Sequence, residues 1–220
     1  MRLNYYDNSW QLVDYCPCDP NFVQFLASKK TEGKLIFHFG TGEHHLVGKD
    51  NYERGNPNEI LAITASRREH DAYIDFIVNN PRAANYYKVL YADIYTLSPR
   101  MLPNFDIVTL FHLCEYYDEV ESGSPRLNSE YARLDDESLL GMFLTKLNPG
   151  GQIAFYAKSG GFISRLDMES EKLVLTEDGP FVRGDRRGAK IVNDFISHGR
   201  MAIQDEYETL FFCGRPAIDG

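Results

Sequence analysis

The sequence predicts an α/β fold in which helices cover both faces of a doubly wound, mainly parallel sheet. Short apolar runs alternate with amphipathic segments between residues 20 and 156. These runs are rich in branched and aromatic residues, which is typical of strands buried on both faces. The pattern changes near the C-terminus, where residues 201–214 contain two strands turning at Asp205-Glu206, the second over Thr209–Cys213. This ending predicts antiparallel edge strands beside the parallel sheet.

The strands and helices are expected in a regular order along the chain. The apolar runs predict strands over residues 35–39, 60–65, 88–92, 105–111 and 152–156. Helices are expected over residues 19–30, in a short stretch after residue 42, over residues 66–80, from residue 135 or 136 to 147, and over residues 191–196. Pro20 suits the first turn of a helix. Ser66, followed three residues later by Glu69, forms the pattern of a capping box.

The length of 220 residues suits a single domain with a substantial core. Within it we expect an N-terminal segment and helix over residues 1–33, and an insertion over residues 157–190 that contains a short strand at Lys172–Thr176. Residues 114–138 form a long acidic, tyrosine-rich connection, and long connections are often functional.

The charge and the apolar pattern exclude several classes of partner. The formal net charge of −9 argues against a general affinity for nucleic acid or anionic membranes. No apolar run is long enough to cross a bilayer, and the first residues lack a secretory signal. Cys114 and Cys213 lie in apolar runs and are expected to be buried free thiols. These features predict a cytoplasmic protein, while the oligomeric state stays open.

A glycine corner follows the first expected strand. Leu35–Phe39 is succeeded by Gly40 and Gly42, which allow a ligand to approach the backbone closely because they carry no Cβ. The carboxyl end of the first strand is also where open α/β sheets bind nucleotides. The pair of glycines is a weak signal alone, so the segments after it decide its meaning.

These segments together resemble the class I S-adenosylmethionine-dependent methyltransferases over about residues 20–215. His38–Gly42 is similar to the first glycine motif, and Ala92-Asp93-Ile94 to the acidic site after the third strand. Phe105–His112 resembles the fourth strand, and Leu147–Phe155 the turn into the fifth. The resemblance implies a Rossmann-like methyltransferase fold, S-adenosylmethionine as cofactor and methyl transfer as activity.

The resemblance also implies roles for individual residues. Gly40, Thr41 and Gly42 would lie against the methionine part of the cofactor, and Asp93 would accept a hydrogen bond from the adenine amino group. Phe111 and His112 would line the pocket beneath the cofactor. The complete set of implied cofactor-binding residues is His38, Phe39, Gly40, Thr41, Gly42, Thr64, Ala65, Ser66, Asp93, Ile94 and Phe111.

The first and second motifs are degenerate. His38 stands where the family has an acidic residue, and His44 where it has a third small residue. Thr64 occupies the end of the second strand, where the family has a carboxylate that binds both ribose hydroxyls. Losing such a charge-assisted contact would weaken binding by about 1.5–3 kcal/mol. Glu69 and Asp71 are the candidates to replace it.

Few residues suggest acid–base chemistry. His112 at the end of the fourth strand is the best candidate for a general base, because histidine titrates near neutral pH. Tyr116 follows it and is a second catalytic candidate. His38, His44 and His45 suggest a metal cluster, but neighbouring histidines on a helix point in different directions, so we expect no metal site.

The sequence therefore predicts an S-adenosylmethionine-dependent methyltransferase that acts on a small molecule. One alternative is an NADP-dependent oxidoreductase, because Ser66-Arg67-Arg68 would suit a 2′-phosphate. Against this alternative, His45 stands where the dinucleotide fingerprint requires a small residue. Another alternative is a non-catalytic methyltransferase-like binding protein, which the degenerate motifs would fit. The acceptor and the atom that is methylated cannot be deduced from the sequence.

Overall fold

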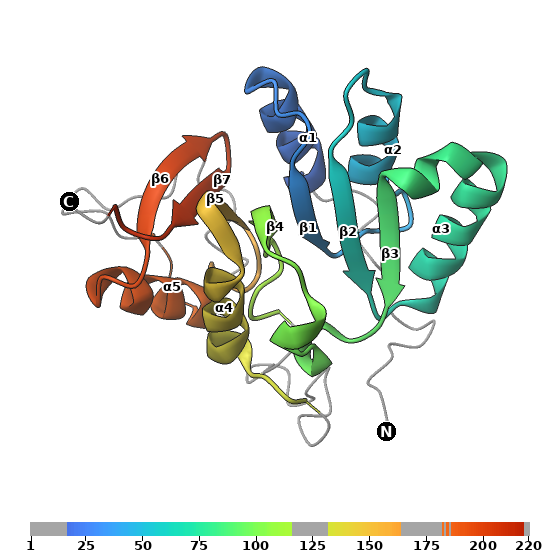
Figure 1. The fold of residues 1–220 in the computed structure, drawn as a ribbon. Helices are drawn as coiled ribbons and strands as arrows, with labels where there is room; N and C mark the ends of the chain where they lie inside the picture. The colour runs from blue at the N-terminus through green and yellow to red at the C-terminus, as the bar shows by residue number, and fades with distance from the viewer. Residues whose placement is uncertain (1–16, 116–131, 164–181, 183, 185, 218–220) are drawn as a thin grey trace.

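The described residues form a seven-stranded sheet with the order β3-β2-β1-β4-β5-β7-β6 (Figure 1). A computed structural model describes residues 17–115, 132–163, 182, 184 and 186–217. The strands are β1 (Leu35–Phe39), β2 (Glu59–Thr64), β3 (Tyr87–Tyr91), β4 (Phe105–Thr109), β5 (Leu147–Tyr156), β6 (Ala202–Tyr207) and β7 (Leu210–Gly214). Strands β1 to β5 pair in parallel, and β7 runs antiparallel to both β5 and β6. The predicted doubly wound sheet with antiparallel edge strands is confirmed.

Helices cover both faces of this sheet. The α-helices are α1 (Cys18–Ser28), α2 (Leu46–Glu53), α3 (Arg67–Asn79), α4 (Asp136–Thr145) and α5 (Arg187–Ser197), and the short 3-10 helices are η1 (Pro81–Asn85), η2 (Ile94–Thr96) and η3 (Pro99–Met101). The apolar residues of α1, α2 and α3 share one core with the sheet, and those of α4 and α5 share the other (Figure 1). The fold is therefore a three-layer α/β/α sandwich.

Strand β1 shows how the chain divides its side chains between the two cores. Successive side chains of a strand point to opposite faces. Ile36 accordingly packs in the core beneath α1–α3, whereas Phe37 and Phe39 pack in the core beneath α4 and α5. His38 therefore points toward α1, where its ring lies parallel to that of Phe22. This alternation determines which residues at the end of β1 can reach a ligand.

The capping signals read from the sequence act where they were expected. Ser66 is the N-cap of α3, and its side chain accepts a hydrogen bond from the Glu69 N–H. Asp135 caps α4 by accepting from the Ser138 N–H. The short helix expected after Gly42 is α2, eight residues long.

The predicted turn of the C-terminal hairpin is wrong by about two residues. Asp205 and Glu206 lie inside β6, and the chain reverses at Glu208 and Thr209, with Glu208 in the left-handed region at φ 53°. Charged side chains are common on an edge strand, where one side of the ladder faces solvent. Asp205 forms an ion pair there at 2.6 Å with Lys29, the C-cap residue of α1. The two acidic residues therefore belong to the strand rather than to the turn.

Several expectations concern residues outside the described part of the chain. Most of the expected insertion, including its strand at Lys172–Thr176, and the long connection between residues 116 and 131 lie there. Cys114 and Cys213 are buried and free, as predicted. No helix among the described residues is both long enough and apolar enough to cross a membrane.

The packing of Gly48 against Tyr87 gives a prediction about stability. A Cβ at Gly48 would lie 2.3 Å from Cε1 of the fully buried Tyr87 ring. Alanine is a better helix former than glycine by about 1 kcal/mol, but overpacking costs about 1–3 kcal/mol. We expect Gly48→Ala to lower the free energy of unfolding in urea. Gly55→Ala is the control, because nothing lies within 4 Å of its Cβ position. A Gly48→Ala protein as stable as the wild type would contradict this packing.

Candidate functional site

A pocket opens at the carboxyl ends of β1, β2 and β3. It encloses about 430 Å³, including the space at its mouth. Its lining comes from the three strand ends and from the segments that follow them. The lining residues are Phe39, Gly40, Ile63, Thr64, Ala65, Ser66, Glu69, Ala92, Asp93, Ile94 and Tyr95. This is the edge of an open α/β sheet at which ligands bind.

The glycine corner forms one wall of the pocket. Gly40 and Gly42 have φ angles of 85° and 55°, in a region that favours glycine. The Gly40 N–H donates to the Ile63 carbonyl at 3.3 Å, which ties the corner to β2. A Cβ at Gly40 would lie 3.1 Å from Cδ2 of His112. Gly40 is therefore required both by the backbone conformation and by the close approach of His112.

Asp93 follows β3 and is buried in the same pocket, with an exposure of 2%. It is the N-cap of η2, where its Oδ1 accepts from the Tyr95 N–H at 2.9 Å. A carboxylate has two oxygens and can accept several hydrogen bonds. Its role as a cap fixes the orientation of the side chain in the pocket.

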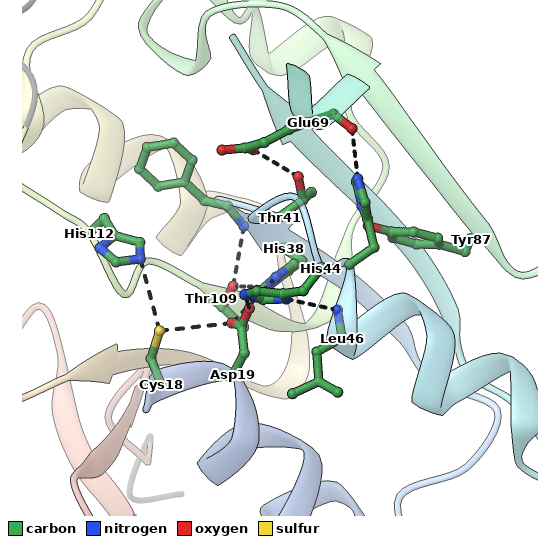
Figure 2. Close-up of polar contacts among 12 residues, drawn as sticks. Cys18, Asp19, His38, Thr41, His44, Leu46, Glu69, Tyr87, Thr109 and His112 are labelled. Atoms are coloured by element: carbon green, nitrogen blue, oxygen red, sulfur yellow. Dashed lines mark hydrogen bonds and ion pairs between the residues drawn. The ribbon is translucent and has the colours of Figure 1, made fainter. Parts of the chain in front are cut away.

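Glu69 is the second buried carboxylate of the pocket, with an exposure of 3%. Its Oε2 accepts a hydrogen bond from the Thr41 hydroxyl at 2.9 Å (Figure 2). The same oxygen accepts from the Thr64 hydroxyl at 2.6 Å. Burial raises the pKa of this carboxyl group, and the two threonine hydrogen bonds oppose that shift. The contacts connect the glycine corner, the end of β2 and the start of α3.

His45 holds the main chain of Glu69 from the other side. Its Nε2 lies 2.7 Å from the Glu69 carbonyl oxygen and its Nδ1 lies 2.7 Å from the Tyr87 hydroxyl. A carbonyl only accepts, so Nε2 is assigned as the donor and Nδ1 as the acceptor from tyrosine. This is a neutral imidazole, in agreement with burial lowering its pKa to about 4. His45 therefore has a structural role beside the pocket.

His38 lies beneath the corner on the opposite face of the sheet. Its Nδ1 is hydrogen bonded to the Thr109 hydroxyl at 2.8 Å, and its Nε2 lies 3.7 Å from Oδ1 of Asp19 (Figure 2). Burial lowers the pKa of His38 to about 3, with smaller contributions from nearby histidines. The ring is therefore neutral at physiological pH and packs under α1.

His112 stands beside the glycine corner but is not among the residues that line the pocket. Its Nδ1 lies 3.0 Å from Oε2 of Glu115, and the Gly160 N–H donates to Oε1 of the same carboxylate at 3.0 Å. Its Nε2 lies 3.9 Å from Sγ of Cys18 (Figure 2). A histidine oriented by a carboxylate is a common arrangement for a general base. Glu115 could have been found in the sequence from its spacing of three residues after His112.

The structure brings together most of the residues predicted to bind the cofactor. Seven of them line the pocket: Phe39, Gly40, Thr64, Ala65, Ser66, Asp93 and Ile94. Thr41 contacts the pocket through Glu69, and Gly42 continues the corner. His38 and Phe111 do not line it, because both pack in the core beneath α1. Sequence reasoning missed Tyr95, which follows Asp93 in η2. Tyr116 lies outside the described residues.

The two candidates for replacing the carboxylate at the end of β2 differ in position. Glu69 points into the pocket, whereas the side chain of Asp71 is 63% exposed and pairs with Arg67 at 3.4 Å. Asp71 is therefore excluded as the residue that replaces this carboxylate. Within the described part of the chain, no group of three or more His, Cys, Asp or Glu side chains could hold a metal ion.

Comparison with known proteins identifies the fold. No family model and no curated protein sequence matches the chain significantly. The CcbJ methyltransferase from Streptomyces caelestis has a TM-score of 0.57 at 12% identity, covering 96% of this chain and 94% of that one. Magnesium protoporphyrin IX methyltransferase from Synechocystis PCC 6803, with bound SAM, has a TM-score of 0.56 at 9% identity, covering 91% and 79%. This chain has the class I methyltransferase fold.

The methyltransferase fold does not by itself establish the reaction. The [4+2]-cyclase SpnF is also similar, with a TM-score of 0.53 at 13% identity, covering 93% of this chain and 64% of that one. Fold and chemistry are separable in widespread architectures. The function has to be argued from the pocket.

The neutral histidines give a prediction about pH. In the unfolded chain histidine protonates near pH 6.5, whereas His38 and His45 stay neutral in the folded protein down to about pH 3 and 4. The unfolded state therefore binds more protons below pH 6.5. We expect the free energy of unfolding to fall by up to about 1.4 kcal/mol per histidine for each pH unit between pH 6.5 and the folded-state pKa of that histidine.

Unfolding in urea at pH 7.5 and pH 5 measures this effect. His45→Gln retains a donor and an acceptor but cannot titrate, so its stability should depend less on pH. His198→Gln is the control, because the His198 side chain is 67% exposed. NMR titration gives an independent result: a His45 ring that is protonated at pH 5.5 in the folded protein would refute the assignment.

Proposed function

We propose that this protein is an S-adenosylmethionine-dependent methyltransferase that acts on a small molecule in the cytoplasm. The observation that carries the proposal is the position of Asp93. It is a buried carboxylate at the end of β3, in the same pocket as the glycine corner at the end of β1. A buried acceptor in the same pocket as a close backbone approach suits adenosine, whose exocyclic amine is a donor.

The similar structures support this ligand. The Synechocystis methyltransferase of the same fold was solved with SAM bound and also with SAH bound. In this chain the corresponding strand ends carry glycines, a buried acid and apolar walls. Methyl transfer from a sulfonium needs mainly alignment and exclusion of water, which such a pocket supplies.

His112 and Glu115 form the side of the site that would receive the acceptor. We propose His112 as the general base and Glu115 as the residue that orients it, based on their separation of 3.0 Å beside Gly40. A base is needed where the acceptor must lose a proton as it is methylated. Tyr116 stays a candidate from the sequence. The net charge of −9 supports a small acceptor rather than nucleic acid.

The electrostatics of the pocket disfavour the NADP-dependent alternative. Arg67 pairs with Asp71 and Arg68 pairs with Glu43 at 2.9 Å, and both arginine side chains are more than half exposed. The charged group that does line the pocket there is Glu69. A carboxylate would repel a 2′-phosphate. A second candidate function, catalysis without methyl transfer, is favoured by one observation, the similarity to a [4+2]-cyclase.

Calorimetry tests the proposal directly. We expect S-adenosylhomocysteine to bind the purified protein and NADPH to give no heat of binding. Binding of NADPH alone would select an oxidoreductase. If neither ligand binds, the pocket has another occupant and the proposal fails.

The role of Asp93 can be tested with two variants. Asp93→Ala and Asp93→Asn should both weaken S-adenosylhomocysteine binding about tenfold or more, because a hydrogen bond to a charged group contributes about 1.5–3 kcal/mol. Asparagine keeps an oxygen that can accept from the Tyr95 N–H, so Asp93→Asn should preserve the cap of η2 and hence the melting temperature. Unchanged affinity in Asp93→Asn would remove Asp93 from the binding site.

A further inference from the structure

The carboxylate of Glu69 points into the pocket instead of closing the end of its own helix. In a capping box, the side chain at this position would accept the N–H of the N-cap residue. Here the Ser66 N–H donates to the Thr64 hydroxyl at 3.0 Å, so that donor is already satisfied. Ser66 still caps the helix by accepting from the Glu69 N–H at 3.4 Å. The sequence pattern is that of a capping box, but the carboxylate is available for another partner.

One oxygen of this carboxylate is occupied and the other is not. Thr41 and Thr64 both donate to Oε2. A hydroxyl has a single hydrogen, so both threonines are fully committed as donors. No described residue donates to Oε1. The two threonines therefore hold the carboxylate in one orientation, with an acceptor oxygen left for a molecule in the pocket.

The surroundings of Glu69 disfavour an anionic ligand group and leave its carboxylate as an acceptor. The two arginines next to it in sequence turn outward to Glu43 and Asp71, so no described cation pairs with its carboxylate. Its immediate partners are hydroxyl groups, and it is nine-tenths or more buried. An acceptor of this kind binds hydroxyl groups well and rejects anions.

We propose that Glu69 binds the vicinal hydroxyls of the ribose of the methyl donor, and that Thr41 and Thr64 position it. This inference rests on the proposed function. It places the sugar-binding carboxylate on the first turn of α3, three residues after the cap, rather than at the end of β2. Glu69 and Asp93 then accept from the two ends of one nucleoside, the sugar and the adenine amine. Glu69 also makes the site selective for an unmodified ribose over a 2′-phosphorylated one.

Ligand analogues test the proposal on the wild-type protein. 5′-Methylthioadenosine and its 2′-deoxy and 3′-deoxy analogues differ only in the hydroxyls that Glu69 would bind. We expect removal of at least one hydroxyl to weaken binding by about tenfold, as for a lost hydrogen bond to a charged group. Equal affinity for all three ligands would overturn the proposal without any substitution in the protein.

Variants connect this selectivity to Glu69. Glu69→Gln should bind 5′-methylthioadenosine about tenfold more weakly and should distinguish less between it and its deoxy analogues. Glu69→Asp, which withdraws the carboxylate by one methylene, should behave similarly if Glu69→Gln folds poorly. Asp71→Asn is the matched control, because it removes the same charge from an exposed position on the same helix and should leave affinity unchanged.

The positioning role of the threonines is tested by a measurement that a purely structural role would not affect. Thr41→Val should weaken binding in the wild-type background but have little further effect when combined with Glu69→Gln, because its hydroxyl acts through Glu69. Full additivity of the two substitutions would overturn the positioning role.

The results separate this proposal from the proposed function. If the wild type binds S-adenosylhomocysteine and Glu69→Gln retains both the affinity and the selectivity for hydroxyls, only the role of Glu69 is overturned. If the wild type binds neither S-adenosylhomocysteine nor 5′-methylthioadenosine, the proposed function itself fails.

Discussion

The candidate site depends on the hydrogen bonds that converge on Glu69. Thr41 from the corner after β1 and Thr64 from the end of β2 donate to its carboxylate, and His45 donates to its carbonyl. These contacts are buried, where hydrogen bonds are strong and unsatisfied groups are costly. They hold three segments that are far apart in sequence in one arrangement. The wall of the pocket is consequently built before any ligand arrives.

In the same region, consecutive residues of β1 lie on opposite faces of the sheet and have different roles. Phe39 lines the pocket, while His38, its neighbour on β1, turns toward α1 and stays neutral beside Phe22. Strand alternation makes this separation unavoidable, since neighbouring residues cannot share a face. The methyltransferase family that this sequence resembles has an acid at this position, and the histidine that stands here lies outside the pocket lining. It changes the packing beneath the glycine corner.

A methyltransferase fold with a threonine at the end of β2 poses a physical problem, because a single hydroxyl replaces a carboxylate. In this protein the threonine instead directs a carboxylate from the next helix into the pocket. After the end of β4, His112 stands beside Gly40 with its Nδ1 3.0 Å from Oε2 of Glu115. The proposed methyl-donor and acceptor sites rest on a buried acid, a glycine corner and a nearby histidine that pairs with Glu115.

The sequence by itself determined the order and type of the elements, because each depends on local patterns. Apolar runs defined the five parallel strands, and Ser66 and Asp135 marked helix starts through contacts within four residues. Gly40 and Asp93 could be assigned to the site, since Gly40 directly follows β1 and Asp93 lies two residues after the end of β3. Only the tertiary structure decided between Glu69 and Asp71, and removed His38 and Phe111 from the pocket lining. Those outcomes depend on contacts between distant segments, such as Thr41 with Glu69, which no local pattern encodes.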